Sequence, residues 1–356
     1  MENTRFMIAS GGTGGHFYPG LALGLALREL GKEVLFVVRK NEPSIRVLTE
    51  HQLSYKEIDL CGLPRSVNPV RHLSFLKKLS TSLFHTRRLI NDFNPDVALG
   101  TGGYISFPLL LCARLKGIKT AVHDSNSRLG LVNRVCGHFT TLFMLGLPVN
   151  KKIKNSVLVS TPLRPEFLAN VNKEEIFNKL GLSPSVPTVL VVGGSQGAKG
   201  LNEAVVQLAH KASAWQFIHI TGTKWFETLK ESYKDCPNVR VLDYSHEIYA
   251  LMKTCDLTIC RSGAGTVAEL IACRLPAVLV PFPHATEDHQ YYNAKVIADC
   301  GAAEIIRENP ALAEQLYSSL LSKTPEELTR MRGAYQHVPV DPIHATEKIT
   351  QLLIKL

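Results

Sequence analysis

The feature that most constrains the fold is a glycine-rich loop set between an apolar run and a helical run. Residues 189–192 read Val-Leu-Val-Val, typical of a short buried strand, and residues 193–200 follow as Gly-Gly-Ser-Gln-Gly-Ala-Lys-Gly. Glycines let the backbone turn tightly and approach a ligand closely. The apolar residues between 204 and 209 indicate a helix. We therefore expect the loop to present backbone N–H groups at a helix N-terminus, a favourable site for a phosphate.

The same arrangement occurs twice more in the first half of the chain. A strand-like run at residues 6–9 leads into Ser-Gly-Gly-Thr-Gly-Gly-His at residues 10–16, and residues 96–99 lead into the glycines of residues 100–103. Three such loops suggest two α/β halves that face one polar, phosphate-bearing ligand set. None of them is G-x-G-x-x-G or G-x-x-x-x-G-K-[ST], which argues against a dehydrogenase and a P-loop NTPase.

Predicted strands and helices alternate along both halves, which favours doubly wound parallel sheets. The strands are expected at residues 6–9, 34–38, 96–99, 119–123 and 157–159, then at 188–192, 217–221, 239–242, 257–260 and 277–281. Helices are expected at residues 21–30 and 42–51, among others. The predicted domains are residues 1–162 and 163–341, with a C-terminal helix at about residues 342–356 that packs back on the first domain.

Charge is distributed unevenly between the halves. The chain carries +9 overall, but residues 1–165 hold 22 Lys and Arg against 10 Asp and Glu, a net charge of +12. This excess indicates an anionic partner, and composition alone leaves nucleic acid and an anionic membrane surface open. Residues 60–91 contain no acidic residue.

Within that basic stretch, one helical face is apolar. Phe75, Leu76, Leu79, Leu83 and Ile90 share this face, and Lys77, Lys78 and Arg88 lie off it. One interpretation is a helix packed on its sheet with a solvated basic face. The other is a segment, residues 65–90, that lies on a membrane surface.

Composition limits the remaining classes of protein. The apolar runs are shorter than the roughly 18 residues that a membrane span needs, and the glycines at 11–15 interrupt any signal-peptide core. The eight cysteines show no metal-binding spacing, so buried free thiols are the expectation. No metal and no cofactor are predicted.

Polar residues follow several of the predicted strands, where open α/β sheets bind ligands. The turn after residues 119–123 reads Asp124-Ser125-Asn126. Glu269 falls near the start of the helix after residues 261–263, where its carboxylate suits a ribose diol or, alternatively, only the helix dipole. Residues 281–284 and 288–290 offer imidazole and amide groups for sugar hydroxyls, with a polar surface turn as the alternative.

Taken in order, these motifs resemble the MurG family of bacterial glycosyltransferases. The motifs are residues 11–16 with Pro19, residues 102–104, residues 193–198, residues 262–264 with Thr266 and Glu269, and residues 288–290 with 293–294. A single glycine loop is weak, whereas the ordered set is specific. The resemblance implies a GT-B fold, with two Rossmann-like domains facing across a cleft. It also implies transfer of N-acetylglucosamine from UDP-GlcNAc to the MurNAc 4-hydroxyl of lipid I, forming lipid II.

The resemblance also implies site residues and partners. The donor-site residues would be Thr13, Gly14, Gly15, Asn126, Arg164, Ser195, Gln196, Ser245, Ala264, Gly265, Thr266, Glu269, His289 and Gln290. The acceptor-site residues would be Gly12, Gly14, Gly15, Gly102, Gly103 and Tyr104. The implied partners are UDP-GlcNAc, lipid I, an anionic membrane surface and other cell-wall synthesis proteins, with no nucleic acid. The implied location is peripheral, on the cytoplasmic face of the inner membrane.

The catalytic residues follow from the implied reaction, which inverts the sugar by direct displacement at C1. Such a displacement needs a general base for the acceptor hydroxyl and stabilisation of the departing UDP. His16 is the first candidate base, because an imidazole with an ordinary pKa of about 6.5 suits that role. Asp124 is the second candidate, or the group that orients His16. Arg164 and the loop amides of residues 193–198 would meet the leaving-group charge without a metal.

Departures from the family pattern affect five residues. Asp124 and Ser125 stand where the family usually has Glu-Gln, which shortens the carboxylate. Phe107 stands where a small residue is common, and Gly265 and Ser245 replace apolar residues, which would loosen the uracil site. A related lipid glycosyltransferase, a UDP-GlcNAc 2-epimerase of similar fold and a non-enzymatic UDP-sugar sensor remain as alternatives.

Overall fold

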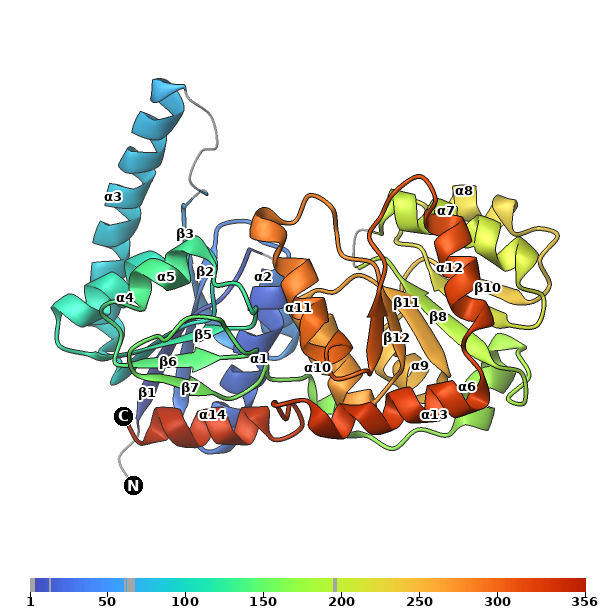
Figure 1. The fold of residues 1–356 in the computed structure, drawn as a ribbon. Coiled ribbons are helices and arrows are strands. Elements are labelled where there is room, and N and C mark those ends of the chain that lie inside the picture. The colour runs from blue at the N-terminus through green and yellow to red at the C-terminus, as the bar shows by residue number, and fades with distance from the viewer. Residues whose placement is uncertain (1–3, 13, 61, 63–67, 195–196) are drawn as a thin grey trace. The chain divides into compact units, whose positions relative to one another are not determined.

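The computed structural model describes residues 4–12, 14–60, 62, 68–194 and 197–356. The chain divides into two compact units (Figure 1). Unit 1 comprises Met1–Arg164 and Val340–Leu356, and unit 2 comprises Pro165–Pro339. Each unit has its own parallel sheet and its own apolar core.

Unit 1 contains a seven-stranded parallel sheet in the order β3-β2-β1-β4-β5-β6-β7. The strands are β1 (Arg5–Ala9), β2 (Glu33–Arg39), β3 (Ser54–Ile58), β4 (Val97–Gly100), β5 (Lys119–Asp124), β6 (Leu142–Leu145) and β7 (Ser156–Leu158). Its helices are α1 (Gly14–Glu29), α2 (Ser44–Glu50), α3 (Pro69–Phe93), α4 (Ser106–Leu115), α5 (Leu131–Cys136) and α14 (Ala345–Ile354). The strand order reverses between β1 and β4, so this is the switch point at which such sheets bind ligands.

Strand β1 shows how the sequence supplies both faces of this sheet. Successive side chains of a strand point to opposite faces. Phe6 and Ile8 enter the core formed with α1 and α14, whereas Met7 and Ala9 enter the core formed with α3 and α4. Because both faces are covered, the strand is apolar from Phe6 to Ala9, as parallel strands generally are.

Unit 2 contains a six-stranded parallel sheet in the order β10-β9-β8-β11-β12-β13. The strands are β8 (Thr188–Val192), β9 (Gln216–Ile220), β10 (Val239–Leu242), β11 (Leu257–Cys260), β12 (Ala277–Leu279) and β13 (Ala303–Ile305). The α-helices are α6 (Lys173–Leu180), α7 (Lys199–Lys211), α8 (Phe226–Ser232), α9 (Ile248–Thr254), α10 (Ala264–Cys273), α11 (His289–Ala298), α12 (Leu312–Leu321) and α13 (Pro325–Ala334). Short 3₁₀ turns are η1 (Pro165–Leu168), η2 (Thr286–Asp288) and η3 (Tyr335–His337).

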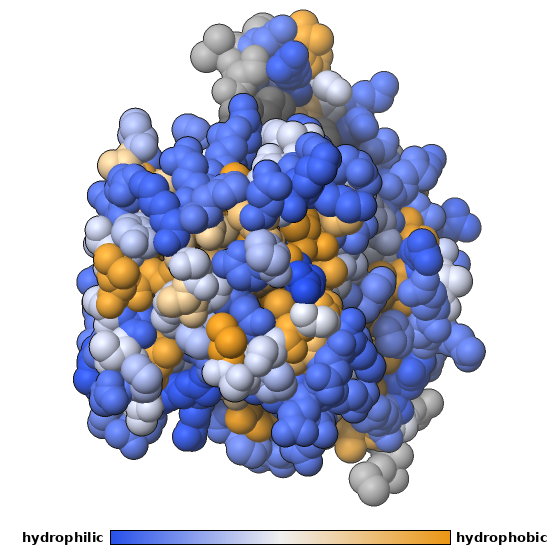
Figure 2. Space-filling model, turned by 90° about the vertical axis from the view of Figure 1, so that its right-hand side faces the viewer, coloured by the Kyte–Doolittle hydropathy of each residue, from blue (hydrophilic) through white to orange (hydrophobic). Residues whose placement is uncertain are grey.

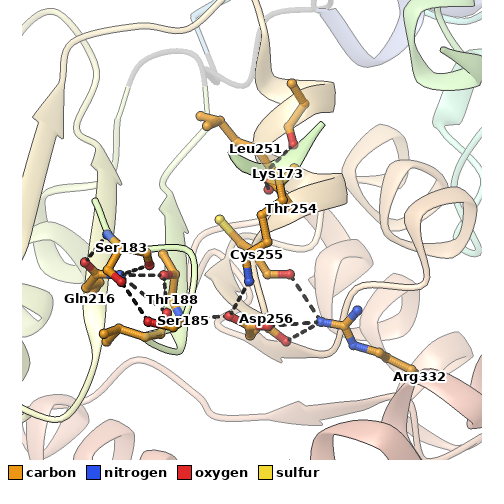
Figure 3. Close-up of polar contacts among 12 residues, drawn as sticks. Lys173, Ser183, Ser185, Thr188, Gln216, Leu251, Thr254, Cys255, Asp256 and Arg332 are labelled. Atoms are coloured by element: carbon orange, nitrogen blue, oxygen red, sulfur yellow. Dashed lines mark hydrogen bonds and ion pairs between the residues drawn. The ribbon is translucent and has the colours of Figure 1, made fainter. Parts of the chain in front are cut away.

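A polar network fixes the amino-terminal ends of the unit 2 strands (Figure 3). The Asp256 carboxylate, just before β11, accepts a hydrogen bond from the Thr188 N–H at 2.9 Å. It also pairs with Lys173 at 3.5 Å and with Arg332 at 3.6 Å. These residues lie at the edge of the sheet opposite the glycine loops, so we assign the network to holding the strands in register.

The face of unit 2 seen in Figure 2 is mostly hydrophilic, with hydrophobic residues in small separate groups.

Helix α1 begins earlier than the predicted run of residues 21–30. It starts at Gly14 and contains Pro19 in its interior. Gly and Pro read as helix breakers in a sequence. Here the glycines lie at the helix start. Leu23 and Leu27 of this helix pack in the same core as β1, and this packing keeps the whole segment helical.

Helix α3 extends beyond the sheet of unit 1 at its N-terminal end (Figure 1). Leu79, Leu83 and Ile90 lie on the packed side, as predicted, and Phe75 is half-buried. Leu76, on the same predicted face, is 55% exposed. The projecting half of the helix has less protein to pack against than the half beside α4. Among the described residues, we find no helix long and apolar enough to span a membrane.

The last helix, α14, lies in unit 1. Ile349 and Leu353 are fully buried in the core that also contains Leu23 and Leu27 of α1. The Lys348 ammonium donates a hydrogen bond to the Leu158 carbonyl at the end of β7, at 2.8 Å. The end of the chain therefore covers the sheet on which the chain begins.

Candidate active site

Two glycine loops meet at the switch point of unit 1. The first follows β1 at Gly11 and Gly12, and α1 begins at Gly14, so first-turn N–H groups without intrahelical partners lie at this loop. The second follows β4, where Gly102 and Gly103 have φ angles of +113° and +73°. A Cβ atom on Gly103 would lie 3.0 Å from the Gly11 carbonyl oxygen, so the two loops touch. Thr13, predicted in this loop, lies outside the described residues.

His16 lies against the second loop. Its Nδ1 atom is buried, and an added Cβ atom on Gly102 would overlap the imidazole ring. Two hydroxyl groups fix its backbone, because Thr101 Oγ1 and Ser10 Oγ donate hydrogen bonds to the His16 carbonyl at 2.8 and 3.1 Å. The side chain is partly exposed. With Nδ1 buried, Nε2 is the nitrogen that a bound hydroxyl group can reach.

A carboxylate that sequence analysis did not single out supports the first loop. Glu42 is only 6% exposed and accepts a hydrogen bond from the Gly12 N–H. Its other contacts are Ser44 Oγ at 3.3 Å and Arg39 Nη2 at 3.7 Å. The sequence predicted Glu42 as the start of a helix, but α2 begins at Ser44. No sequence pattern near Glu42 indicates that its side chain contacts Gly12.

Asp124 organises the turn after β5. It is 1% exposed, and its carboxylate accepts hydrogen bonds from Asn126 N (3.0 Å), Gly130 N (3.0 Å) and Asn133 Nδ2 (2.9 Å). Because all three donors belong to the turn and the helix α5 that follow β5, the geometry favours a role in positioning Asn126. The neighbouring His123 is fully buried, and burial lowers the pKa of its imidazole.

Two further predicted residues of unit 1 lie at its surface. Tyr104, just after Gly103, is 36% exposed. Arg164, the last residue of the first segment of this unit, places its guanidinium 5.5 Å from the centroid of the Tyr18 ring. Tyr18 belongs to α1, two residues after His16.

The unit 2 sheet presents a matching glycine loop between β8 and α7. Gly194 and Gly197 have φ angles of +91° and +71°. Ser195 and Gln196, predicted to meet the donor, lie outside the described residues. Behind the loop, Glu308 pairs with Arg261 and fills the space that a Cβ atom on Gly200 would need. This carboxylate, like Glu42, was missed because its partner is distant in the sequence.

Hydrogen bonds connect the segment after β11 to helix α11. Ser262 Oγ donates a hydrogen bond to the Gln290 carbonyl at 2.8 Å, and Gln290 Oε1 accepts one from the Phe282 N–H at 2.9 Å. With Oε1 so engaged, the Gln290 Nε2 amide group is oriented as a donor. His289 Nδ1 lies 2.9 Å from the Thr286 carbonyl.

The remaining predicted residues of unit 2 follow β10 and β11. Ala264, Gly265 and Thr266 form the first turn of α10, and Glu269 lies partly exposed in its second turn. A Cβ atom on Gly265 would meet open space. Ser245, in the turn after β10, accepts a hydrogen bond from the Glu247 N–H at 3.2 Å. Among the described residues there is no group of three or more His, Cys, Asp and Glu side chains that could hold a metal ion.

Comparison with known proteins gives matches to both halves of the chain. Residues 6–144 match the glycosyltransferase family 28 N-terminal domain, and residues 188–339 match the family 28 C-terminal domain. A UDP-N-acetylglucosamine–N-acetylmuramyl-(pentapeptide) pyrophosphoryl-undecaprenol N-acetylglucosamine transferase from Elusimicrobium minutum is 47% identical over 359 residues, covering 99% of each chain.

Solved structures agree. The crystal structure of Acinetobacter baumannii MurG has a TM-score of 0.82 and 29% identity, covering 99% of this chain and 100% of that one. A UDP-N-acetylglucosamine 2-epimerase shares the fold alone, with a TM-score of 0.65 and 13% identity over 99% of this chain and 96% of that one. The predicted architecture of two Rossmann-like parallel-sheet domains, of the GT-B type, is confirmed. The chain belongs to glycosyltransferase family 28 and, within it, to the MurG family.

Proposed function

We propose that this protein is an inverting glycosyltransferase that moves N-acetylglucosamine from UDP-GlcNAc to the MurNAc 4-hydroxyl of lipid I, forming lipid II for peptidoglycan synthesis. The observation that carries the proposal is the site geometry of unit 1, in a chain 47% identical to a transferase of that activity. Two touching glycine loops and a helix N-terminus suit the diphosphate of the acceptor. His16 lies directly beside them.

The proposed chemistry follows from these groups. His16 Nε2 takes the proton of the acceptor 4-hydroxyl as the hydroxyl oxygen bonds to C1 of N-acetylglucosamine. The bond between C1 and the diphosphate oxygen breaks, and UDP leaves with its electron pair. A positioned base of this kind is typically worth about 10²–10⁴ in rate. In this proposal, Asp124 orients Asn126 and leaves the proton to His16.

We assign the donor to the loops of unit 2. The turn of residues 193–198 and Arg164 meet the diphosphate, and the Glu269 carboxylate accepts hydrogen bonds from the ribose hydroxyls. Gln290, with its Nε2 oriented by Phe282, binds the sugar. We also assign Asn126 and the first glycine loop of unit 1 to donor binding. The backbone near Ser245 reads the uracil edge, and the open space beside Gly265 gives that site room.

The outer face of α3 supports the proposed membrane contact. Val70, Leu73, Leu76 and Phe84 are 71%, 69%, 55% and 71% exposed. Lys77, Arg87 and Arg88 are exposed on the same side of the helix. Apolar groups flanked by basic ones suit an anionic membrane surface. Lys78 is less suited than predicted, because it pairs with Asp59 at 2.9 Å. The proposed location is the cytoplasmic face of the inner membrane.

The function is tested by incubating the protein with UDP-GlcNAc labelled in the sugar and a lipid I analogue. We expect label in a disaccharide lipid and one equivalent of UDP released for each product formed. A 2-epimerase would convert the donor to its 2-epimer with no acceptor present. A related lipid glycosyltransferase would use diacylglycerol in place of the lipid I analogue. Binding of UDP-GlcNAc without turnover on either acceptor would identify a sensor.

A further inference from the structure

A buried histidine of unit 2 lies within a chain of hydrogen bonds that ends at the donor loop. His219, on β9, is fully buried. Its Nδ1 atom lies 2.7 Å from the Tyr233 hydroxyl, and its Nε2 atom lies 3.1 Å from Asn202 Oδ1. Asn202 is itself only 1% exposed and lies in the first turn of α7, which directly follows the glycine loop.

The donors and acceptors of this chain can be assigned. Asn202 Nδ2 donates to the Thr221 carbonyl at 3.0 Å, so Oδ1 is the atom that faces His219. His219 Nε2 must then carry the proton, and Nδ1 accepts a hydrogen bond from the Tyr233 hydroxyl. Burial lowers the pKa of His219 to about 3, so the ring is neutral at neutral pH. The hydrogen bonds therefore run in one direction, from the Tyr233 hydroxyl to the Thr221 carbonyl.

The Thr221 carbonyl is where this chain meets the glycine loop. Gly197 lies so close to it that a Cβ atom on Gly197 would overlap the Thr221 oxygen. Asn202 N donates to the Ala198 carbonyl at 2.8 Å, which ties the same asparagine to the end of the loop. Asn202 thus joins three pieces of backbone, namely the end of β9, the Gly197 turn and the first turn of α7.

We propose that His219, Asn202 and Tyr233 are positioning residues for the donor diphosphate. This inference rests on the proposed function, which assigns the diphosphate to the loop of residues 193–198. None of the three side chains is exposed enough to touch a ligand. They act by fixing the Gly197 turn and the direction of the N–H groups at the α7 N-terminus. A neutral histidine suits the central place because it donates from one nitrogen and accepts at the other.

The test compares the affinity for UDP with the affinity for uridine in variants of the full chain. His219→Leu removes both hydrogen bonds and should raise the dissociation constant for UDP and the KM for UDP-GlcNAc roughly tenfold. Uridine affinity and kcat should change less than twofold, because uridine lacks the diphosphate. His219→Gln should recover most of the UDP affinity, since its amide N–H can still donate to Asn202 Oδ1.

Tyr317→Phe is the matched control, because Tyr317 packs at the edge of the same core and lies outside the chain of hydrogen bonds. It should leave the affinities for UDP and uridine unchanged. If His219→Leu does not fold, Tyr233→Phe serves as the second variant, with the same selective loss of UDP affinity expected. Equal losses for UDP and uridine, or no loss for either, would overturn the positioning role. A wild-type protein that fails to bind UDP would instead contradict the proposed function.

Discussion

The conformation of His16 depends on the absence of a side chain at residue 102. The Gly102→Ala variant would add a methyl group at the place of the imidazole, at a residue whose φ is +113°. L-residues other than glycine rarely adopt this conformation. We therefore expect the ring to be displaced and kcat to fall about as far as when a base is lost, roughly 10²–10⁴-fold. UDP binding, measured by calorimetry, should be unchanged, and a variant with normal turnover would contradict this packing.

His16→Ala should lower kcat by about 10²–10⁴ and leave UDP affinity nearly unchanged, because the nucleotide is assigned to unit 2. The acidic limb of the rate–pH profile should disappear with the imidazole. Asp124→Asn is the comparison. We expect it to disturb the turn held by Asn126, Gly130 and Asn133 and to raise the KM for the donor. Near-normal turnover in His16→Ala, with loss in Asp124→Asn, would make Asp124 the base.

Single residues differ in how far the sequence could predict them. The glycine loops were predictable because the signal is local, an apolar strand followed by glycines and a helix. Glu42 and His219 were not, because their partners at Gly12, Asn202 and Tyr233 are set by tertiary packing. Asp124 was predicted from its place at a strand end, but only the structure gives its three donors.

Helix α3 offers an element-scale test of membrane contact. Replacing Lys77, Arg87 and Arg88 together by Glu should release the protein from anionic vesicles, since each basic contact is worth about 1 kcal/mol near such a surface. Binding is measured by vesicle co-sedimentation. Activity on a short-chain, water-soluble acceptor should be retained, because α3 holds none of the proposed catalytic groups.

The control for α3 makes the same change of net charge on unit 2. Lys224, Lys230 and Lys234 are exposed and lie in and around α8. Their replacement by Glu should leave vesicle binding near that of the wild type. Equal release by both sets would mean that overall charge, and not α3, governs binding. Retained binding after the α3 reversal would make α3 an ordinary packed helix.

At the scale of elements, periodicity predicted most strands and several helices, but not every element or boundary; α5, α12 and α13 were not predicted. The strands β3, β6 and β13 were missed, although the equally short β7 and β12 were predicted. The side of α3 that packs was predicted for Leu79 and Leu83, where α4 lies alongside. Leu76 is exposed; periodicity gives the face of a helix but not how far its neighbours extend.

For the whole molecule, the two-domain arrangement followed from a repeated order of strands, loops and helices. The return of α14 to unit 1 was expected from its amphipathic sequence, and Ile349 and Leu353 are buried there. The proposed site of each unit lies at the switch point of its sheet, which strand order alone determines once the topology is known. The contacts that hold each glycine loop in place join residues that are distant in the sequence, so only the folded structure reveals them.

A whole-molecule prediction concerns stability toward acid. His123 in unit 1 and His219 in unit 2 are fully buried, and burial lowers the pKa of both imidazoles, that of His219 to about 3. An unfolded imidazole has a pKa of about 6.5, so between these values only the unfolded chain binds the proton. The free energy of unfolding must then fall as the pH decreases below about 6.5, and it is fully retained above that value. Each such proton contributes at most about 1.4 kcal/mol per pH unit.

Unfolding by urea at pH 7.5 and pH 5.5 measures this effect in unit 2, because both tryptophans, Trp215 and Trp225, lie in that unit. We expect the wild type to lose stability between the two pH values, and His219→Gln to lose about 1.4 kcal/mol less. His123→Gln is the matched control and should keep the wild-type loss in the fluorescence signal, because His123 belongs to unit 1. A loss in His219→Gln as large as in the wild type would mean that His219 binds its proton equally in the folded and unfolded states.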